Sequence, residues 1–173
     1  METQFSTGDS LLMDEEILTA YHESGHAVVA YALGGTVDRV QLGGEADDWL
    51  PERFGDCRIR WTVDAGSEGQ KRREILTILA GPVAEMVYRD EQLHPAVYGP
   101  WKHDWQRAWV TAETLWPDLQ QRMRSLETMI VELRRYIGQG ICWAAIAALA
   151  DELVAHETME EERVEEVLGF WIR

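Results

Sequence analysis

Cysteines and basic side chains are scarce in this chain. Its 173 residues include two cysteines, Cys57 and Cys142, and 16 lysines and arginines against 31 aspartates and glutamates. Two isolated cysteines form neither a disulfide framework nor a metal-binding pair, so we expect reduced thiols and a cytoplasmic location. The net charge of −15 would repel a phosphate backbone, so we expect no nucleic-acid partner.

Long apolar runs are also missing. The most apolar stretch, residues 141–150, is much shorter than the ~20 residues that a membrane-spanning helix needs, and no charged-then-apolar signal segment opens the sequence. We therefore expect no membrane partner. A hydrophobic content of 46% suffices for one well-buried core in a chain of this length, and we predict a single domain over residues 1–173.

One short motif, H-E-x-x-H, carries clear chemistry. It is formed by His22, Glu23 and His26. On a helix, histidines four residues apart lie one turn above the other, so both imidazoles can reach one metal ion. In zinc hydrolases the glutamate of this motif takes a proton from a water molecule at the open metal position. The alternative is a surface helix that carries two histidines by chance.

The flanking residues predict that the motif lies inside a helix. Apolar residues recur with helical spacing over residues 14–33. Asp14 is the expected N-cap, and Gly34 and Gly35 are the expected C-terminal stop. The spacing of the two histidines therefore corresponds to one helical turn.

A small sheet is predicted to follow this helix. Residues 36–42 have β-like composition, and residues 58–63 alternate strictly, with Ile59, Trp61 and Val63 on one face. An edge of such a sheet could bind an extended peptide by strand addition. An ordinary sheet that covers the core explains the pattern at least as well.

The rest of the sequence predicts further helices. Gly81 and Pro82 should kink or split the first of them, and Thr158 and Glu161 have the spacing of a capping box at the start of the last. The fold class expected is mainly α (α+β), with a small β-sheet of two or three short strands. The expected helices cover residues 67–89, 103–116, 119–137, 141–156 and 159–168.

A third metal ligand has to come from downstream of the motif. Asp104 is the best candidate, since it lies near a helix start after a loop rich in proline and glycine, although such an aspartate can also simply cap its helix. Glu85 is the rival: it lies among apolar residues, where it could bind the metal or accept a hydrogen bond from a ligand imidazole. His103 should point about 100° away from Asp104 around the helix. His94 and His156 are expected to be surface histidines.

Four segments, in the same order, resemble the peptidase domain of the FtsH-type ATP-dependent zinc metalloproteases. Residues 19–29 (TAYHESGHAVV) are similar to its zinc-binding helix. Residues 79–85 (LAGPVAE) resemble its Gly-Arg-x-Ala-Glu-Glu helix, residues 103–108 (HDWQRA) its Asn-Asp-x-x-x-Ala helix, and residues 153–158 (LVAHET) its Leu-x-x-x-Glu-Thr stretch. The resemblance implies a zincin-like helical metallopeptidase domain. It also implies that Asp104 is the third zinc ligand and that Glu85 lies close to the metal.

The chain also departs from that family. We find no G-x-x-x-x-G-K-[ST] phosphate loop, no AAA-type ATPase and no membrane anchor, and the residues before Asp104 differ from the family's glycine-rich turn. We therefore predict an ATP-independent zinc (Zn²⁺) metalloendopeptidase that cleaves peptides or unfolded protein segments, unless a separate AAA ATPase supplies them. The alternatives are a non-proteolytic zinc-binding interaction or regulatory module and a zinc site used only for stability.

Three tryptophans are spaced four residues apart along the chain: Trp101, Trp105 and Trp109. Packing in the core or at a subunit interface is the preferred interpretation, and an aromatic wall beside the substrate is the alternative. The resemblance favours an interface, because the family's protease domains associate as a ring. A homo-oligomer is therefore a possible assembly.

Overall fold

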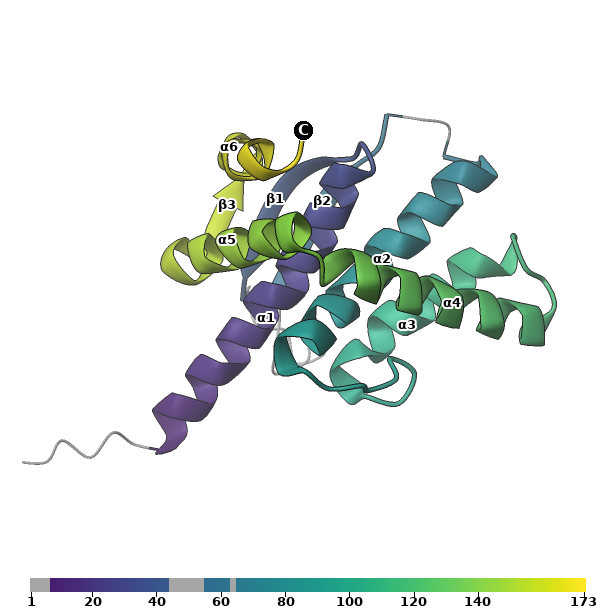
Figure 1. The fold of residues 1–173 in the computed structure, drawn as a ribbon, viewed down its shortest axis with the longest axis horizontal. Coiled ribbons are helices and arrows are strands. Elements are labelled where there is room, and N and C mark those ends of the chain that lie inside the picture. Colours follow the sequence, from purple (N-terminus) through teal and green to yellow (C-terminus); the bar gives the residue numbers. More distant parts are fainter. Residues whose placement is uncertain (1–6, 44–54, 63–64) are drawn as a thin grey trace, which may run out of the picture.

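The computed structural model describes residues 7–43, 55–62 and 65–173 (Figure 1). The described part is mainly helical with a small three-stranded antiparallel sheet, which confirms the coarse fold class predicted. The elements are α1 (Thr7–Ala32), β1 (Thr36–Leu42), β2 (Gly55–Arg60), α2 (Glu68–Arg89), the 3-10 turn η1 (Gly99–Trp101), α3 (Lys102–Glu113), α4 (Leu119–Ile137), α5 (Gly140–His156), β3 (Thr158–Glu160) and α6 (Glu161–Trp171).

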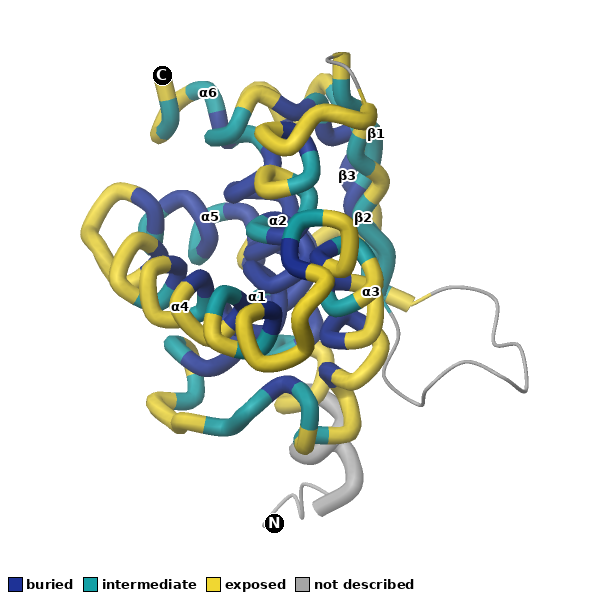
Figure 2. Tube along the Cα trace, turned by 90° about the vertical axis from the view of Figure 1, so that its right-hand side faces the viewer, coloured by how far each residue is buried: buried dark blue, intermediate teal, exposed yellow. Residues whose placement is uncertain are grey.

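Helices α1 and α2 form the centre of the molecule, and the buried residues concentrate around them (Figures 1 and 2). Small side chains let the two helices approach closely: a Cβ atom on Gly25 would lie 2.5 Å from the carbonyl oxygen of Ala80 and 2.6 Å from the Cβ atom of Ala84. Gly25 lies between Glu23 and His26, so this close contact fixes the H-E-x-x-H motif of α1 against α2.

Helix α1 begins earlier than predicted and ends where predicted. It starts at Thr7, so Asp14 lies inside the helix and is not its N-cap. The apolar spacing over residues 14–33 therefore predicts only part of the helix. Gly34, at φ 90°, follows the last turn and stops the helix, as predicted.

Helix α2 runs continuously through Pro82. Of the two predicted effects of Gly81 and Pro82, the split is therefore wrong, and the kink stays a prediction. Both residues are buried in the contact between helices, and tertiary packing there outweighs the loss of one backbone hydrogen bond. The side chain of Ser67 caps the start of the helix, where its hydroxyl accepts a hydrogen bond from the backbone N–H of Gln70 at 3.1 Å.

The sheet has the strand order β2-β1-β3, and both pairs are antiparallel. Val40 in the central strand faces Cys57 on one side and Met159 on the other. β2 spans Gly55–Arg60 rather than residues 58–63, and the predicted position of Val63 lies outside the described residues. Within the described part of the chain β2 is an edge strand.

The last helix differs from its prediction at its start. Thr158 belongs to β3, and helix α6 begins at Glu161 after Glu160, whose side chain makes no capping hydrogen bond. The predicted capping box is therefore wrong. Thr158 instead pairs with Gln41 of β1 in the sheet.

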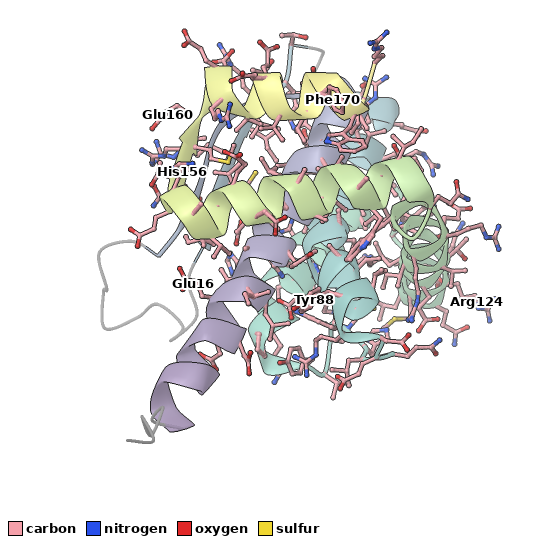
Figure 3. All side chains as sticks on the ribbon, turned by 60° about the vertical axis from the view of Figure 1, so that its left-hand side comes forward. Glu16, Tyr88, Arg124, His156, Glu160 and Phe170 are labelled. Carbon is pink, nitrogen blue, oxygen red and sulfur yellow. The ribbon has the colours of Figure 1, made fainter. Side chains whose placement is uncertain are left out.

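Helix α5 packs on α1, and α6 packs on α5 and on β1, whereas α3 and α4 pack on α2 (Figures 1 and 3). No single described helix is both long and apolar enough to cross a membrane, although α4 and α5 together, bent by 83°, reach that length and composition. His156 lies at the end of α5 on the outer edge of the molecule, exposed and 3.6 Å from Glu152, which confirms the prediction of a surface histidine.

Candidate metal centre

Three side chains from two helices meet at one buried point. His22 and His26 come from successive turns of α1, and Asp104 comes from the first turn of α3. His22 Nε2 lies 2.8 Å and His26 Nε2 lies 3.7 Å from Asp104 Oδ2. Among the described residues these three offer ligand atoms that all lie within 4.8 Å of one another, so the group could hold a metal ion.

Asp104 does not serve as a helix cap. The residue at the N-cap of α3 is Trp101, and it makes no side-chain capping hydrogen bond. The Asp104 carboxylate is buried and directed at the two histidines instead. The simple capping role that the sequence left open for this residue is therefore absent.

Each histidine is held from behind by helix α2. His22 Nδ1 lies 3.2 Å from Glu85 Oε1, and His26 Nδ1 donates to the backbone carbonyl oxygen of Thr77 at 2.8 Å. A carbonyl oxygen only accepts hydrogen bonds, so Nδ1 of His26 carries the proton. In the neutral imidazole the lone pair of Nε2 then faces Asp104. This is the arrangement that orients histidines for metal binding.

Glu85 is fully buried and belongs to the outer hydrogen bonds of the site. Its carboxylate contacts the far nitrogen of His22, and it is not part of the group of three potential ligands. The geometry therefore groups Asp104 with the two histidines as potential ligands and places Glu85 outside that group, as a hydrogen-bond partner of His22.

Burial and the neighbouring charges act in opposite directions on the carboxyls of the site. Burial alone would raise the pKa of Asp104, but the charge of His26 and the hydrogen bonds with His22 and His26 outweigh it, so this pKa is well below its ordinary value. Burial raises the pKa of Glu23, and the two histidines offset part of that rise. Asp104 is therefore the anionic partner of the histidines, while Glu23 is the more basic carboxylate.

Two glycines, Gly81 and Gly55, lie where a larger side chain would clash with residues of the site. A Cβ atom on Gly81 would contact His26 Nε2 and would lie 2.8 Å from His22 Nε2, the two nitrogens that face Asp104. A Cβ atom on Gly55, at the start of β2, would lie 2.6 Å from Glu23 Oε1. The edge strand therefore lies directly beside the carboxylate of the motif.

Some parts of this arrangement have no signature in the amino-acid sequence. The acceptor for His26 is a main-chain carbonyl, which any residue at position 77 would provide. The position of β2 beside Glu23 depends on strand pairing across residues that are far apart in the chain. Burial together with the charges of Glu23 and Asp56 raises the pKa of Cys57 well above its ordinary value, and no sequence pattern predicts that these side chains lie close together.

The remaining predicted residues lie outside the group of ligands. Trp101 and Trp105 are buried, while Trp109 is partly buried, with the Arg122 guanidinium 4.8 Å from its ring centroid. Packing is therefore the role that the structure gives to these tryptophans. His103 is exposed on α3. His94 is partly buried: its ring contacts Trp105, and its Nδ1 accepts a hydrogen bond from the backbone of Ala96.

No protein-family model matches this chain, and no curated protein matches it. The function of the site therefore has to be inferred from its residues and their geometry.

Proposed function

We propose that this chain is a zinc-dependent metallopeptidase of the FtsH-like, zincin type. The observation that carries the proposal is the buried group of His22, His26 and Asp104 with the Glu23 carboxyl beside it. Two imidazoles and one carboxylate are a donor set that zinc takes in catalytic sites, where three protein ligands leave one position open.

The donor atoms fit a zinc ion closely. Tetrahedral zinc with bonds of about 2.0–2.2 Å places its ligand atoms about 3.3 Å apart. The separations from Asp104 Oδ2 to the two histidine Nε2 atoms, 2.8 and 3.7 Å, lie on either side of this value. The hydrogen bonds to Glu85 and Thr77 already orient both imidazoles. Small adjustments of these side chains would therefore complete the site.

Glu23 is the proposed general base. A bound zinc ion supplies Lewis acidity, which polarises a peptide carbonyl and lowers the pKa of water. Glu23 accepts the proton of the attacking water and passes it to the leaving amine. Glu85 and Thr77 engage the Nδ1 atoms of His22 and His26, so the Nε2 atoms of both rings face the site.

The edge strand β2 offers a way to place a substrate. Within the described residues it pairs only with β1, and its first residue, Gly55, contacts Glu23. An extended peptide that pairs with the free edge of β2 would run past Glu23 and the metal ligands. A stably folded domain cannot present its backbone in this way, so the proposed substrates are peptides and unfolded segments, with a separate ATPase as the proposed source of unfolded protein.

The competing function is a zinc-binding interaction or regulatory module without proteolysis. It needs the three ligands but gives no role to a buried carboxylate beside them. Substitution of Glu23→Gln separates the two functions, because it keeps the size of the side chain and all three ligands but removes the base.

The test uses purified protein loaded with zinc, elemental analysis and a flexible casein-like substrate, with and without chelator. A peptidase predicts about one zinc per chain in the wild type and in Glu23→Gln, with chelator-sensitive cleavage that falls by ~10²-fold or more in the variant. Asp104→Ala should lose most of the zinc and serves as the ligand control. Wild-type protein that holds zinc but cleaves nothing supports the module, and equal cleavage by both proteins removes Glu23 from the mechanism.

A further inference from the structure

A cavity of about 560 Å³ opens beside the metal centre, between β2, α2 and α3. Its size lies within the roughly 300–1,000 Å³ range of small-molecule and cofactor sites. None of the three potential metal ligands or Glu23 lines it. It is therefore a separate space that needs its own occupant.

The cavity shares its walls with the metal centre. Thr77 lines it through α2, and the carbonyl oxygen of the same residue accepts the hydrogen bond of His26. His103 and Arg107 line it through α3, one residue before and three residues after Asp104. Cys57 lines it through β2, two residues after the glycine that contacts Glu23. A peptide that crosses the metal along β2 would thus place a neighbouring side chain at this cavity.

The apolar residues that line the cavity differ in exposure. Ile59, Trp61 and Ile78 form apolar walls, and Ile78 is 8% exposed. Val110 is 65% exposed, so this residue stands at the outer end. The shape is that of a side-chain pocket with an apolar interior.

The charges around the cavity balance. Glu74 lines the cavity from α2, and Arg107 lines it from α3. Their opposite charges offset each other, so these two residues favour neither a cationic nor an anionic occupant. The indole of Trp61 and the exposed guanidinium of Arg107 favour an aromatic occupant. The ring of such an occupant can stack on the indole and present its face to the guanidinium.

We propose that this cavity is the specificity pocket of the peptidase and that it takes a large aromatic side chain next to the scissile bond. The inference rests on the proposed function and adds the substrate class: flexible peptides with phenylalanine, tyrosine or tryptophan at one position beside the cut. Trp61, Val110 and Arg107 are the residues of this chain that set the preference.

Val110→Trp tests the pocket, because it narrows the mouth from an exposed position that is not part of the core. The matched control is Val131→Trp, an equally bulky change at a 59% exposed valine on α4. Zinc-loaded proteins are given one peptide series with alanine, aspartate, leucine, phenylalanine or tyrosine at a single position, and cut sites are mapped by mass spectrometry. Burial of an aromatic ring predicts a kcat/KM ratio of phenylalanine to alanine on the order of 10- to 100-fold.

In Val110→Trp this ratio should fall toward one through loss of activity on the phenylalanine peptide, while Val131→Trp should keep the wild-type ratio. A second measurement avoids any need for cleavage: titration calorimetry with the zinc-chelating hydroxamates of phenylalanine and alanine. The phenylalanine compound should bind wild type and Val131→Trp more tightly than the alanine compound, and Val110→Trp should bind both equally.

The outcomes separate this inference from the proposed function. Cleavage without an aromatic preference, or with the same preference in Val110→Trp, overturns the pocket and leaves the peptidase. A hydroxamate preference that Val110→Trp abolishes, in a protein that cleaves no peptide, overturns the peptidase and, with it, the role in substrate specificity, and leaves the cavity as an aromatic-binding site beside the metal centre. Equal binding of both hydroxamates by the wild type overturns the pocket.

Discussion

The metal centre and the C-terminal layer of α5 and α6 are both buried, but they are filled with different side chains. Around the metal centre the buried residues include two histidines and three carboxylic acids, each at most 8% exposed: His22, Glu23, His26, Glu85 and Asp104. The C-terminal layer buries apolar groups instead, with Ile146, Leu149, Leu153 and Leu168 at most 2% exposed.

The apolar C-terminal layer therefore contributes stability, and the metal centre holds the polar side chains that can carry out chemistry. Burial of charged groups costs free energy even when they are paired, whereas each fully buried leucine contributes about 1.5–3 kcal/mol. Helix α1 contacts both regions, since it carries the two histidines and also packs against α5. The apolar layer therefore stabilises the helix whose polar residues form the metal centre.

The largest effect is expected from Gly81→Ala, which damages the metal centre and leaves the C-terminal layer alone. The added methyl group would occupy the space in front of His26 Nε2 and His22 Nε2, so zinc binding should be lost. Overpacking should also cost about 1–3 kcal/mol of unfolding free energy. Elemental analysis and thermal melting measure the two effects.

Gly69→Ala is the matched control for that change. Gly69 lies in the same helix, and a Cβ atom there would meet nothing within 4 Å. It should keep its zinc and its stability or gain slightly, because alanine is the better helix former. Equal zinc content in the two variants would show that the ligands do not use the space beside Gly81.

The next effect is expected from Leu153→Ala, which damages the apolar layer and leaves the metal centre alone. Leu153 is fully buried, so the cavity should cost roughly 2–5 kcal/mol in denaturant unfolding. Zinc content per folded chain should stay the same. Val154→Ala, at the adjacent 40% exposed position, should cost far less. Loss of zinc from folded Leu153→Ala would show that the two regions are coupled.

The smallest effect is expected from Glu85→Gln, which keeps a hydrogen-bond acceptor for His22 but removes its charge. Loss of an outer hydrogen bond of this kind typically lowers metal affinity by ~10–100-fold. Because the amide of glutamine can still accept a hydrogen bond, the loss of zinc affinity in Glu85→Gln should lie at the lower end of this range. Competition with a zinc chelator of known affinity measures the change. A loss as complete as that of Asp104→Ala would make Glu85 a ligand.

The sequence predicted the local parts of this molecule better than the parts that depend on contacts. β1 and α4 have their predicted bounds, and the histidines lie on one helix, because their signals are local spacing and turn residues. Asp104 was selected with the help of a family resemblance, and the structure brings it to the histidines.

Thr158 has the side chain and spacing of a helix cap, yet it joins β3, because pairing with β1 outweighs a local cap. The pocket beside Thr77 joins three elements and has no local signal.

His22 and Asp104 are 82 positions apart in the chain, so a metal ion bound to both would link distant parts of it. Zinc held by both residues would act as a reversible cross-link that closes this loop, and closure of a loop this long is worth about 4 kcal/mol in chain entropy. His22 and His26 belong to one helix and can receive the ion first, while Asp104 completes the link only when α3 docks. The rate at which zinc exchanges with solution would then measure how often α3 opens.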